Sequence, residues 1–132
     1  MTLLCDTNII SELCKPQPDP GVIAWSATVT TIAISVITLE EIIYGLNAKP
    51  NTRIQDWFQE FLETYCQVLP ITSEIAQCAG QLRGKLRTQG MPRTQADMLI
   101  AATTQVRHLT LVTRNTRDFE NCDIQILNPF SR

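Results

Sequence analysis

LLCDTNIISE, residues 3–12, is a short apolar run that stops at an acid and continues in a helical pattern. Residues 3–5 have the length and composition of a buried parallel strand, and Asp6 stands at its end. The residues that follow place Ile9 and Ile10 on one side of a helix. A buried strand that leads directly into a helix favours an α/β fold.

The rest of the chain repeats this alternation. Strands are predicted at residues 3–5, 31–35, 68–71, 109–113 and 124–127, and helices at residues 7–14, 20–25, 37–47, 51–67, 73–89 and 95–108, with a polar turn or short helix at 114–120. Alternating strands and helices require crossover connections, which predicts a central, mostly parallel sheet with helices on both faces. Since no linker or repeat divides the chain, residues 1–132 are predicted to form one domain.

Local signals suggest how several elements begin and end. Thr38, with Glu41 three residues later, fits a capping box for the helix over 37–47. Ser73 fits the N-cap of the helix over 73–89, and Gly90 fits its end. Pro70 predicts that the strand over 68–71 lies at a sheet edge or ends there.

Composition limits the possible classes of protein. Of 132 residues, 44% are apolar and 18% are charged, which excludes a disordered chain. We predict a cytoplasmic protein, because no apolar stretch could span a membrane and Asp6 comes too early for a signal peptide. The net charge of −2 argues against nucleic-acid binding through global positive charge, but not against a cluster of acids at a metal site. The 5 cysteines lack the spacing of a zinc site and are predicted to be reduced.

Polar residues stand where two predicted strands end. Asp6 ends the first strand, Thr113 and Asn115 end the fourth, and Asp118 follows a helical turn later. Ligands of open parallel sheets bind outside the carboxyl ends of the strands. These residues are therefore candidates for a functional site, although Asp6 also fits a helix cap, and Asn115 and Asp118 fit turn formers.

Two further acids stand out by their neighbours. Asp97 opens a helix of apolar and small residues, where the helix dipole favours a carboxylate. Glu41 has Gly45 one turn later, which leaves open space beside it. Each residue also fits an ordinary first-turn acid or a capping residue. Three or four carboxylates in one cleft would require a cation or a proton, and oxygen ligands without histidine or cysteine suit Mg²⁺ or Mn²⁺.

Four motifs in order give the sequence a clear family resemblance. LLCDTNIISE (3–12), SVITLEEIIYG (35–45), QADMLIAAT (95–103) and LVTRNTRDF (111–119) resemble the four motifs of PIN-domain nucleases, those of VapC-type toxins in particular. The closing residues 127–130 are similar to the tail of the same group. The resemblance covers nearly the whole chain.

This resemblance implies a three-layer sandwich with a five-stranded parallel sheet and a Mg²⁺-dependent site that cuts RNA, often tRNA. It also implies a homodimer that is neutralised by a VapB-type antitoxin, through which alone the chain would be associated with DNA. Carried over by position, Asp6 and Asp97 would be metal ligands, and Glu41 would be a further ligand or would position the attacking water. Asn115 stands where many relatives have an acid, so we predict that Asp118 supplies the fourth carboxylate.

Other residues would support this site or bind the substrate. Asn8 and Ser11 would orient the ligands from the first helix, with Thr113 and Asn115 as further polar contacts, although Asn8 and Ser11 also fit an ordinary helix start. The predicted phosphate contacts are Arg83, Lys85, Arg87, Arg93, Arg114 and Arg117. The alternatives are a merely solvated face or, for Arg114 or Arg117, an ion pair with an acid of the site. The aromatic positions Trp25, Trp57, Phe58, Phe61 and Tyr65 fit core packing or an antitoxin or dimer contact.

Two other functions fit the sequence less well. A phosphatase with an aspartate nucleophile also places an acid after its first strand, but it needs a second acid where this chain has Asn8. A degenerate PIN module that only binds RNA or a protein would lack two or more acids, whereas Asp6, Glu41 and Asp97 are all present. A metal-dependent ribonuclease is therefore the leading hypothesis.

Overall fold

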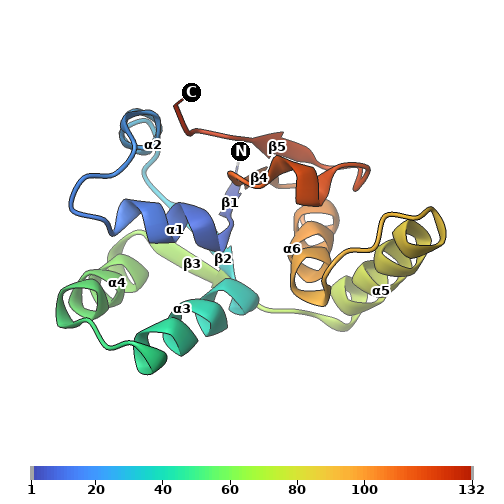
Figure 1. Ribbon diagram of the computed structural model, residues 1–132, viewed down its shortest axis with the longest axis horizontal. Coiled ribbons are helices and arrows are strands. Elements are labelled where there is room, and N and C mark those ends of the chain that lie inside the picture. The colour runs from blue at the N-terminus through green and yellow to red at the C-terminus, as the bar shows by residue number, and fades with distance from the viewer. Residues whose placement is uncertain (1, 132) are drawn as a thin grey trace.

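The computed structural model describes residues 2–131 and shows an α/β fold (Figure 1). In chain order its elements are β1 (Leu3–Cys5), α1 (Thr7–Leu13), α2 (Pro20–Ser26), β2 (Ile32–Ser35), α3 (Val36–Ala48), α4 (Thr52–Thr64), β3 (Cys66–Leu69), α5 (Ser73–Thr88), α6 (Gln95–Val106), β4 (Thr110–Val112), the 3₁₀-helix η1 (Thr116–Phe119) and β5 (Gln125–Leu127). The predicted alternation of strands and helices is confirmed, and each predicted strand is present.

All five strands form one parallel sheet in the order β3-β2-β1-β4-β5. From β1 the chain builds the sheet outward through β2 to β3, and then crosses to the other side of β1 to add β4 and β5. The point where the strand order reverses therefore lies between β1 and β4. In open parallel sheets this point opens a crevice at the carboxyl ends of the strands, where ligands bind.

Helices cover both faces of the sheet, as predicted. α1 to α4 lie on one side and α5 and α6 on the other (Figure 1). The strand side chains alternate between the two layers: Leu4 and Leu111 pack with α5 and α6, whereas Cys5 and Val112 pack with α1 to α4. β1 to β4 thus contribute to two apolar cores, which fixes their register because a shift by one residue would exchange the two faces.

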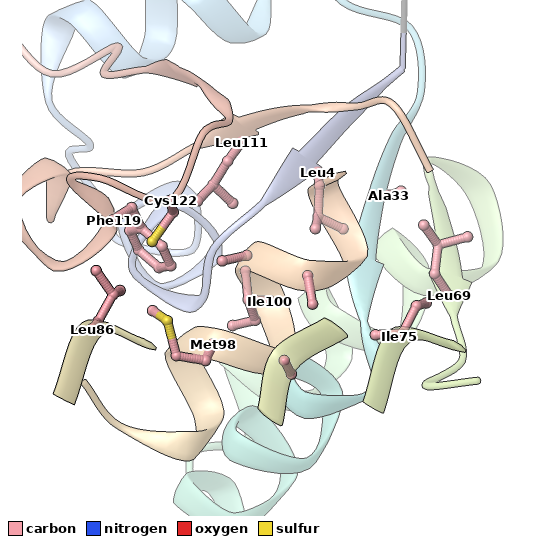
Figure 2. Close-up of a cluster of buried hydrophobic side chains, with 13 residues drawn as sticks. Leu4, Ala33, Leu69, Ile75, Leu86, Met98, Ile100, Leu111, Phe119 and Cys122 are labelled. Atoms are coloured by element: carbon pink, nitrogen blue, oxygen red, sulfur yellow. The ribbon is translucent and has the colours of Figure 1, made fainter. Parts of the chain in front are cut away.

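The apolar core between the sheet and the helices α5 and α6 fixes the position of α6, which carries Asp97. Figure 2 shows Leu4 and Leu111 of the sheet, Met98 and Ile100 of α6, and Phe119 of η1 gathered in one cluster. These side chains are at most 1% exposed. This packing fixes the start of α6 against β1 and η1, and so fixes Asp97 relative to Asp6.

Two predicted caps are wrong. Ser35, the last residue of β2, caps α3 by accepting a hydrogen bond from Ile37 N at 3.0 Å, so α3 begins at Val36 and Thr38 lies inside its first turn, fully buried. Thr72 rather than Ser73 caps α5, because its hydroxyl accepts the Ile75 N–H at 3.2 Å. In both cases a polar side chain just before the expected cap meets the free N–H groups first.

The third strand lies earlier than predicted. It spans Cys66–Leu69 rather than 68–71, and α4 ends at Thr64 rather than at 67. Pro70 has no N–H to donate, so pairing with β2 ends one residue before it, with Leu69 opposite Ser35. The prediction of an edge strand is confirmed, since β3 is the outermost strand on its side. Within residues 2–131 no helix is both long and apolar enough to span a membrane.

Candidate active site

A cleft of about 430 Å³ lies at the carboxyl ends of β1 and β4, where the strand order reverses. Three of the four predicted acids line it: Asp6 after β1, Glu41 in α3 and Asp97 at the start of α6. They are joined by Asn115, which follows β4. The fold therefore brings together residues that lie as far apart in the sequence as positions 6 and 115.

Asp6 is held by hydrogen bonds to both carboxylate oxygens. Its Oδ1 accepts the Thr7 N–H at 2.8 Å, which also makes Asp6 the N-cap of α1. Its Oδ2 accepts the Thr113 hydroxyl at 2.8 Å and the Asn8 side-chain amide at 3.1 Å. The side chain is only 6% exposed, so these three donors fix its orientation at the base of the cleft.

Asn8 and Thr113 connect β1, α1 and the loop after β4. Asn8 Oδ1 accepts the Arg114 N–H at 3.0 Å, while Thr113 Oγ1 accepts the Asn115 N–H at 3.0 Å. The Asn8 amide also lies 3.3 Å from Thr113 Oγ1. Both residues thus have the supporting geometry that the sequence predicted for them. Ser11 lines the cleft, but within residues 2–131 its side chain makes no hydrogen bond to an acid.

Glu41 is oriented by the first turn of α1. Thr7 donates its hydroxyl hydrogen to Glu41 Oε1 at 2.6 Å, and the same hydroxyl oxygen lies 3.2 Å from the buried hydroxyl of Thr38. Thr38 therefore contacts the residue that holds Glu41, and it does not cap its own helix. Glu41 is itself exposed, and its second oxygen is left for the cleft. The neighbouring Glu40 does not line the cleft.

Asp97 projects into the cleft from the first turn of α6. Thr94 caps the helix by accepting the Asp97 N–H at 3.1 Å. Burial raises the pKa of the Asp97 carboxyl, and the negative charges of Asp6, Asp118 and Glu41 raise it further against the hydrogen bond from Thr94. The charges of all four predicted acids therefore converge on this position.

The pKa of Asp6 is raised as well. Burial is the main cause and the charge of Glu41 adds to it, while the hydrogen bonds from Thr113, Thr7 and Asn8 oppose the shift. Neighbouring carboxylates disfavour one another's negative charge, and a bound cation would relieve this repulsion.

Asp118 and Asn115 have different places in the site. Asn115 lines the cleft, whereas Asp118 is an exposed residue of η1 outside its lining. Asp118 is nevertheless close enough to Asp97 for its charge to raise the pKa of that carboxyl. The Asp118 N–H donates to Asn115 O at 3.1 Å, so the two residues belong to one tight turn.

The donor set fits a hard divalent cation. The cleft presents carboxylate, amide and hydroxyl oxygens and no histidine or cysteine. Within residues 2–131 no three acidic, histidine or cysteine side chains lie close enough together to enclose a metal ion by themselves. Mg²⁺ is commonly held by one or two carboxylates, with water and substrate phosphates as its other ligands. Asp6 and Asp97 meet that smaller requirement.

The predicted basic residues are spread over two regions. Arg83, Lys85 and Arg87 are exposed on α5, and Arg117 is exposed on η1. Arg93 donates from Nη1 to Arg117 O at 2.8 Å, which ties the loop before α6 to η1. Arg114 is the predicted cation that lines the acidic cleft.

Sequence reasoning missed four residues of the cleft: Thr7, Glu12, Lys15 and Phe130. Glu12 is 7% exposed, pairs with Lys15 Nζ at 2.8 Å and accepts the Asp19 N–H at 2.8 Å. It belongs to the first motif, so its position was a usable signal. Phe130 comes from the far end of the chain, and no local pattern indicates that it reaches the cleft.

Most of the aromatic side chains pack in the core. Phe58 and Phe61 are 2% and 8% exposed, and Trp57 stacks on Phe61 with ring centroids 5.0 Å apart. A groove of about 370 Å³ between α2 and α4 remains, lined in part by Trp25 and Trp57. Tyr65 beside it is 51% exposed, so the five aromatic residues divide between the core and the surface.

Comparisons with known proteins agree with the fold and with the predicted family. The family model described as PIN domain matches residues 3–124. The chain is 34% identical to the VapC ribonuclease Y4jK of Sinorhizobium fredii, over 97% of both chains. It is 31% identical to the tRNA(fMet)-specific endonuclease VapC of Shigella flexneri, over 91% of both chains. A solved structure described as a toxin-antitoxin complex from Klebsiella pneumoniae has a TM-score of 0.78 at 27% identity, over 99% of this chain and 100% of the other.

Proposed function

The chain belongs to the PIN domain family, and we propose that it is a Mg²⁺-dependent endoribonuclease of the VapC type, a toxin that hydrolyses RNA phosphodiester bonds. PIN-domain nucleases generally depend on divalent metal ions. The observation that carries the proposal is the convergence of Asp6, Glu41 and Asp97 in one cleft, where the charge of Glu41 adds to burial in raising the pKa values of Asp6 and Asp97.

We assign the roles of the acids from their geometry. Asp6 and Asp97 are the proposed metal ligands, because both have raised pKa values and both line the cleft. Bound Mg²⁺ supplies a water of lowered pKa and neutralises charge on the scissile phosphate. Asp118 remains our proposed fourth acid, with Asn115 as a polar contact. Asn8, Thr113 and, from the cleft wall, Ser11 are the proposed supporting residues.

Glu41 is the exposed acid among those that line the cleft. One oxygen is engaged by Thr7, and the other is left for a water molecule or a metal ion. We propose that Glu41 orients the attacking water or serves as a further ligand. Either role requires its negative charge, because both a cation and a polarised water hydrogen are electropositive.

The proposed substrate is RNA, with tRNA as the first candidate because the Shigella relative is named for tRNA(fMet). We propose that Arg83, Lys85, Arg87, Arg93, Arg114 and Arg117 contact its phosphates. Since Arg93 also bonds to Arg117 O, its truncation would test binding and the local fold together. Arg87 is the cleaner position for a single variant.

We also propose control by a VapB-type antitoxin and assembly as a homodimer. Support for the antitoxin comes from the related toxin-antitoxin complex. The groove beside Trp25 and Trp57 and the exposed Tyr65 suit an apolar contact with such a partner. Light scattering of the purified chain, alone and with the antitoxin, would measure both assemblies.

The decisive experiment uses the adjacent glutamates of α3. A total tRNA pool is incubated with the wild-type chain, Glu41→Gln and Glu40→Gln, each with Mg²⁺ and with EDTA. We expect discrete fragments from the wild type and Glu40→Gln only with Mg²⁺, and none from Glu41→Gln. Equal cutting by both variants would remove Glu41 from the mechanism. No cutting by folded wild-type protein would contradict a tRNA nuclease.

A further inference from the structure

A second cleft of about 540 Å³ adjoins the acidic cleft. Glu12, Lys15, Arg114 and Phe130 line both clefts, and Pro18 and Asp19 extend the second one toward the start of α2. The two clefts therefore form one continuous depression. We call the part beyond Arg114 and Phe130 the flanking cleft.

Hydrogen bonds lower the pKa values of the flanking-cleft acids Glu12 and Asp19, whereas burial raises the pKa values of Asp6 and Asp97. Asp19 accepts four hydrogen bonds, from the N–H groups of Gly21, Val22 and Ser131 and from the Ser131 hydroxyl. Glu12 is bound by Lys15 and by the Asp19 N–H. Asp19 is therefore satisfied by hydrogen bonds, and Glu12 by its ion pair with Lys15 and the Asp19 N–H.

Arg114 is the cation of this cleft that lacks a carboxylate partner within residues 2–131. Its guanidinium carbon lies 4.6 Å above the centroid of the Phe130 ring. Its backbone N–H donates to Asn8, which in turn bonds to Asp6. The Arg114 side chain thus lies over the Phe130 ring, where the two clefts meet.

The end of the chain keeps Phe130 in place. Ser131 bonds to Asp19 through its N–H at 2.8 Å and its hydroxyl at 2.6 Å. The Phe130 N–H donates to Asn128 Oδ1 at 3.0 Å. Gly21 permits the close approach, since a Cβ there would lie 2.4 Å from Pro129 O and 2.6 Å from Ser131 N. The tail is docked, and Phe130 forms a wall shared by both clefts.

We propose that the flanking cleft binds the RNA phosphate next to the scissile one, with Arg114 as its ligand and Phe130 as the residue that positions Arg114. This inference rests on the proposed ribonuclease function. A guanidinium presents a planar fork of N–H groups that suits a phosphate, and a cation–π contact with a ring helps to hold it in place. A phosphodiester chain carries such an anion on both sides of the bond that is cut.

The first test measures binding without cleavage. A fluorescently labelled single-stranded RNA of twelve nucleotides is titrated in EDTA against the wild type, Arg114→Ala and Arg107→Ala. Arg107 is the C-cap of α6 and lines neither cleft. Arg107→Ala therefore removes one positive charge, as Arg114→Ala does, but away from the proposed site. We expect Arg114→Ala to weaken binding about tenfold and to lower the salt slope of log K by about 0.7. Arg107→Ala is expected to leave binding near that of the wild type.

The second test asks whether Phe130 acts through Arg114. Phe130→Leu keeps an apolar side chain but removes the ring, and we expect a loss of about threefold in affinity. Phe130→Tyr keeps the ring and should restore binding. In the Arg114→Ala background Phe130→Leu should have no further effect, because the group that it positions is gone. A loss that is equal in both backgrounds would overturn the positioning role.

These outcomes are separate from those of the proposed function. RNA that binds to the wild type in EDTA but is never cut with Mg²⁺ would contradict the ribonuclease and leave the phosphate site standing. RNA that is cut normally while Arg114→Ala binds as well as the wild type would overturn only the flanking cleft. No binding by the wild type in EDTA would also overturn it, because a site built on Arg114 does not need the metal.

Discussion

The hydroxyl of Thr113 donates a 2.8 Å hydrogen bond to Oδ2 of Asp6 across 107 residues of sequence. Thr113 is fully buried at the end of β4, and Asp6 stands at the end of the neighbouring strand β1. This contact crosses the point where the strand order reverses. It links the register of the sheet to the orientation of a proposed metal ligand.

Thr113→Val should reduce activity without unfolding the chain. Valine has nearly the same shape but no hydroxyl, so Asp6 loses a donor and turns more freely. Loss of such an orienting bond typically costs about 10–100-fold in metal affinity or activity. Thr113→Ser keeps the hydroxyl and should retain most activity. RNA cleavage rates as a function of Mg²⁺ concentration measure this effect, and equal rates for valine and serine would show that the bond is dispensable.

Mg²⁺ should stabilise the folded chain through the same acids. A ligand at a hundredfold excess over its dissociation constant adds about 2.7 kcal/mol to the free energy of unfolding. We expect a rise in Tm on adding Mg²⁺ to the wild type and to Glu40→Gln, reversed by EDTA. Asp97→Asn should lose this rise. An equal response of all three proteins would place the bound ion elsewhere.

Without metal, the free energy of unfolding should increase as the pH falls from 7.5 toward 4.5. The pKa values of Asp6 and Asp97 are raised in the folded state, so the folded state binds more protons than the unfolded state in this range. The destabilisation is therefore complete above the raised pKa values and is relieved below them. Asp97→Asn removes one such group and should flatten the dependence, as urea unfolding in EDTA would show.

The pKa values of Glu12 and Asp19 are shifted in the opposite direction. Their effect on the free energy of unfolding therefore has the opposite sign and falls in a more acidic pH range. Hydrogen bonds from Lys15 lower the pKa of Glu12, and hydrogen bonds from Ser131 lower the pKa of Asp19. Their contribution to stability is present above their ordinary pKa values and is lost in more acidic solution. A stability maximum on the acid side of neutrality, followed by a decline, is the expected combined profile.

Asp118→Asn should raise the Mg²⁺ concentration needed for half-maximal cleavage by about tenfold, as loss of a residue that tunes a metal site typically does. The matched control is Asp123→Asn, since Asp123 is an exposed acid with a φ of 55° that asparagine also tolerates. Combining Asp118→Asn with Asn115→Asp returns a carboxylate to the cleft and should recover activity. An unchanged metal requirement in Asp118→Asn would exclude it as the fourth acid.

The fold and the acids could be predicted because their signals are local. The motif around Asp6 combines a buried strand, a helix cap and a proposed metal ligand in ten residues, and Asp97 and Glu41 lie in similar short patterns. The structure distinguishes Glu41 from Glu40, because Glu41 lines the cleft and accepts a hydrogen bond from Thr7 of α1.

The wrong or missing predictions share a different cause. Thr38 was expected to cap its helix, but its environment is set by Thr7 of another helix. Phe130 and Ser131 reach the site only because the sheet brings the last strand beside the start of α2, where Asp19 is held. Contacts between residues more than a hundred positions apart depend on tertiary packing, which no local pattern encodes.

Gly21→Ala should destabilise the chain, even though alanine is the better helix former. The added Cβ would lie 2.4 Å from Pro129 O, which is backbone and cannot turn aside. We expect a loss of about 1–3 kcal/mol in the free energy of unfolding, because the tail or α2 must shift. Gly84→Ala in α5 is the matched control, since a Cβ there meets nothing within 4 Å.

In the control variant Gly84→Ala, the free energy of unfolding should change in the opposite direction. An exposed glycine in a helix interior costs about 0.5–1 kcal/mol relative to alanine, so Gly84→Ala should stabilise the chain by that amount. Urea unfolding of both variants gives the two signs in one experiment. If Gly21→Ala were also stabilising, the tail would not need its close approach to α2, and the placement of Phe130 beside Arg114 would have to come from the apolar core alone.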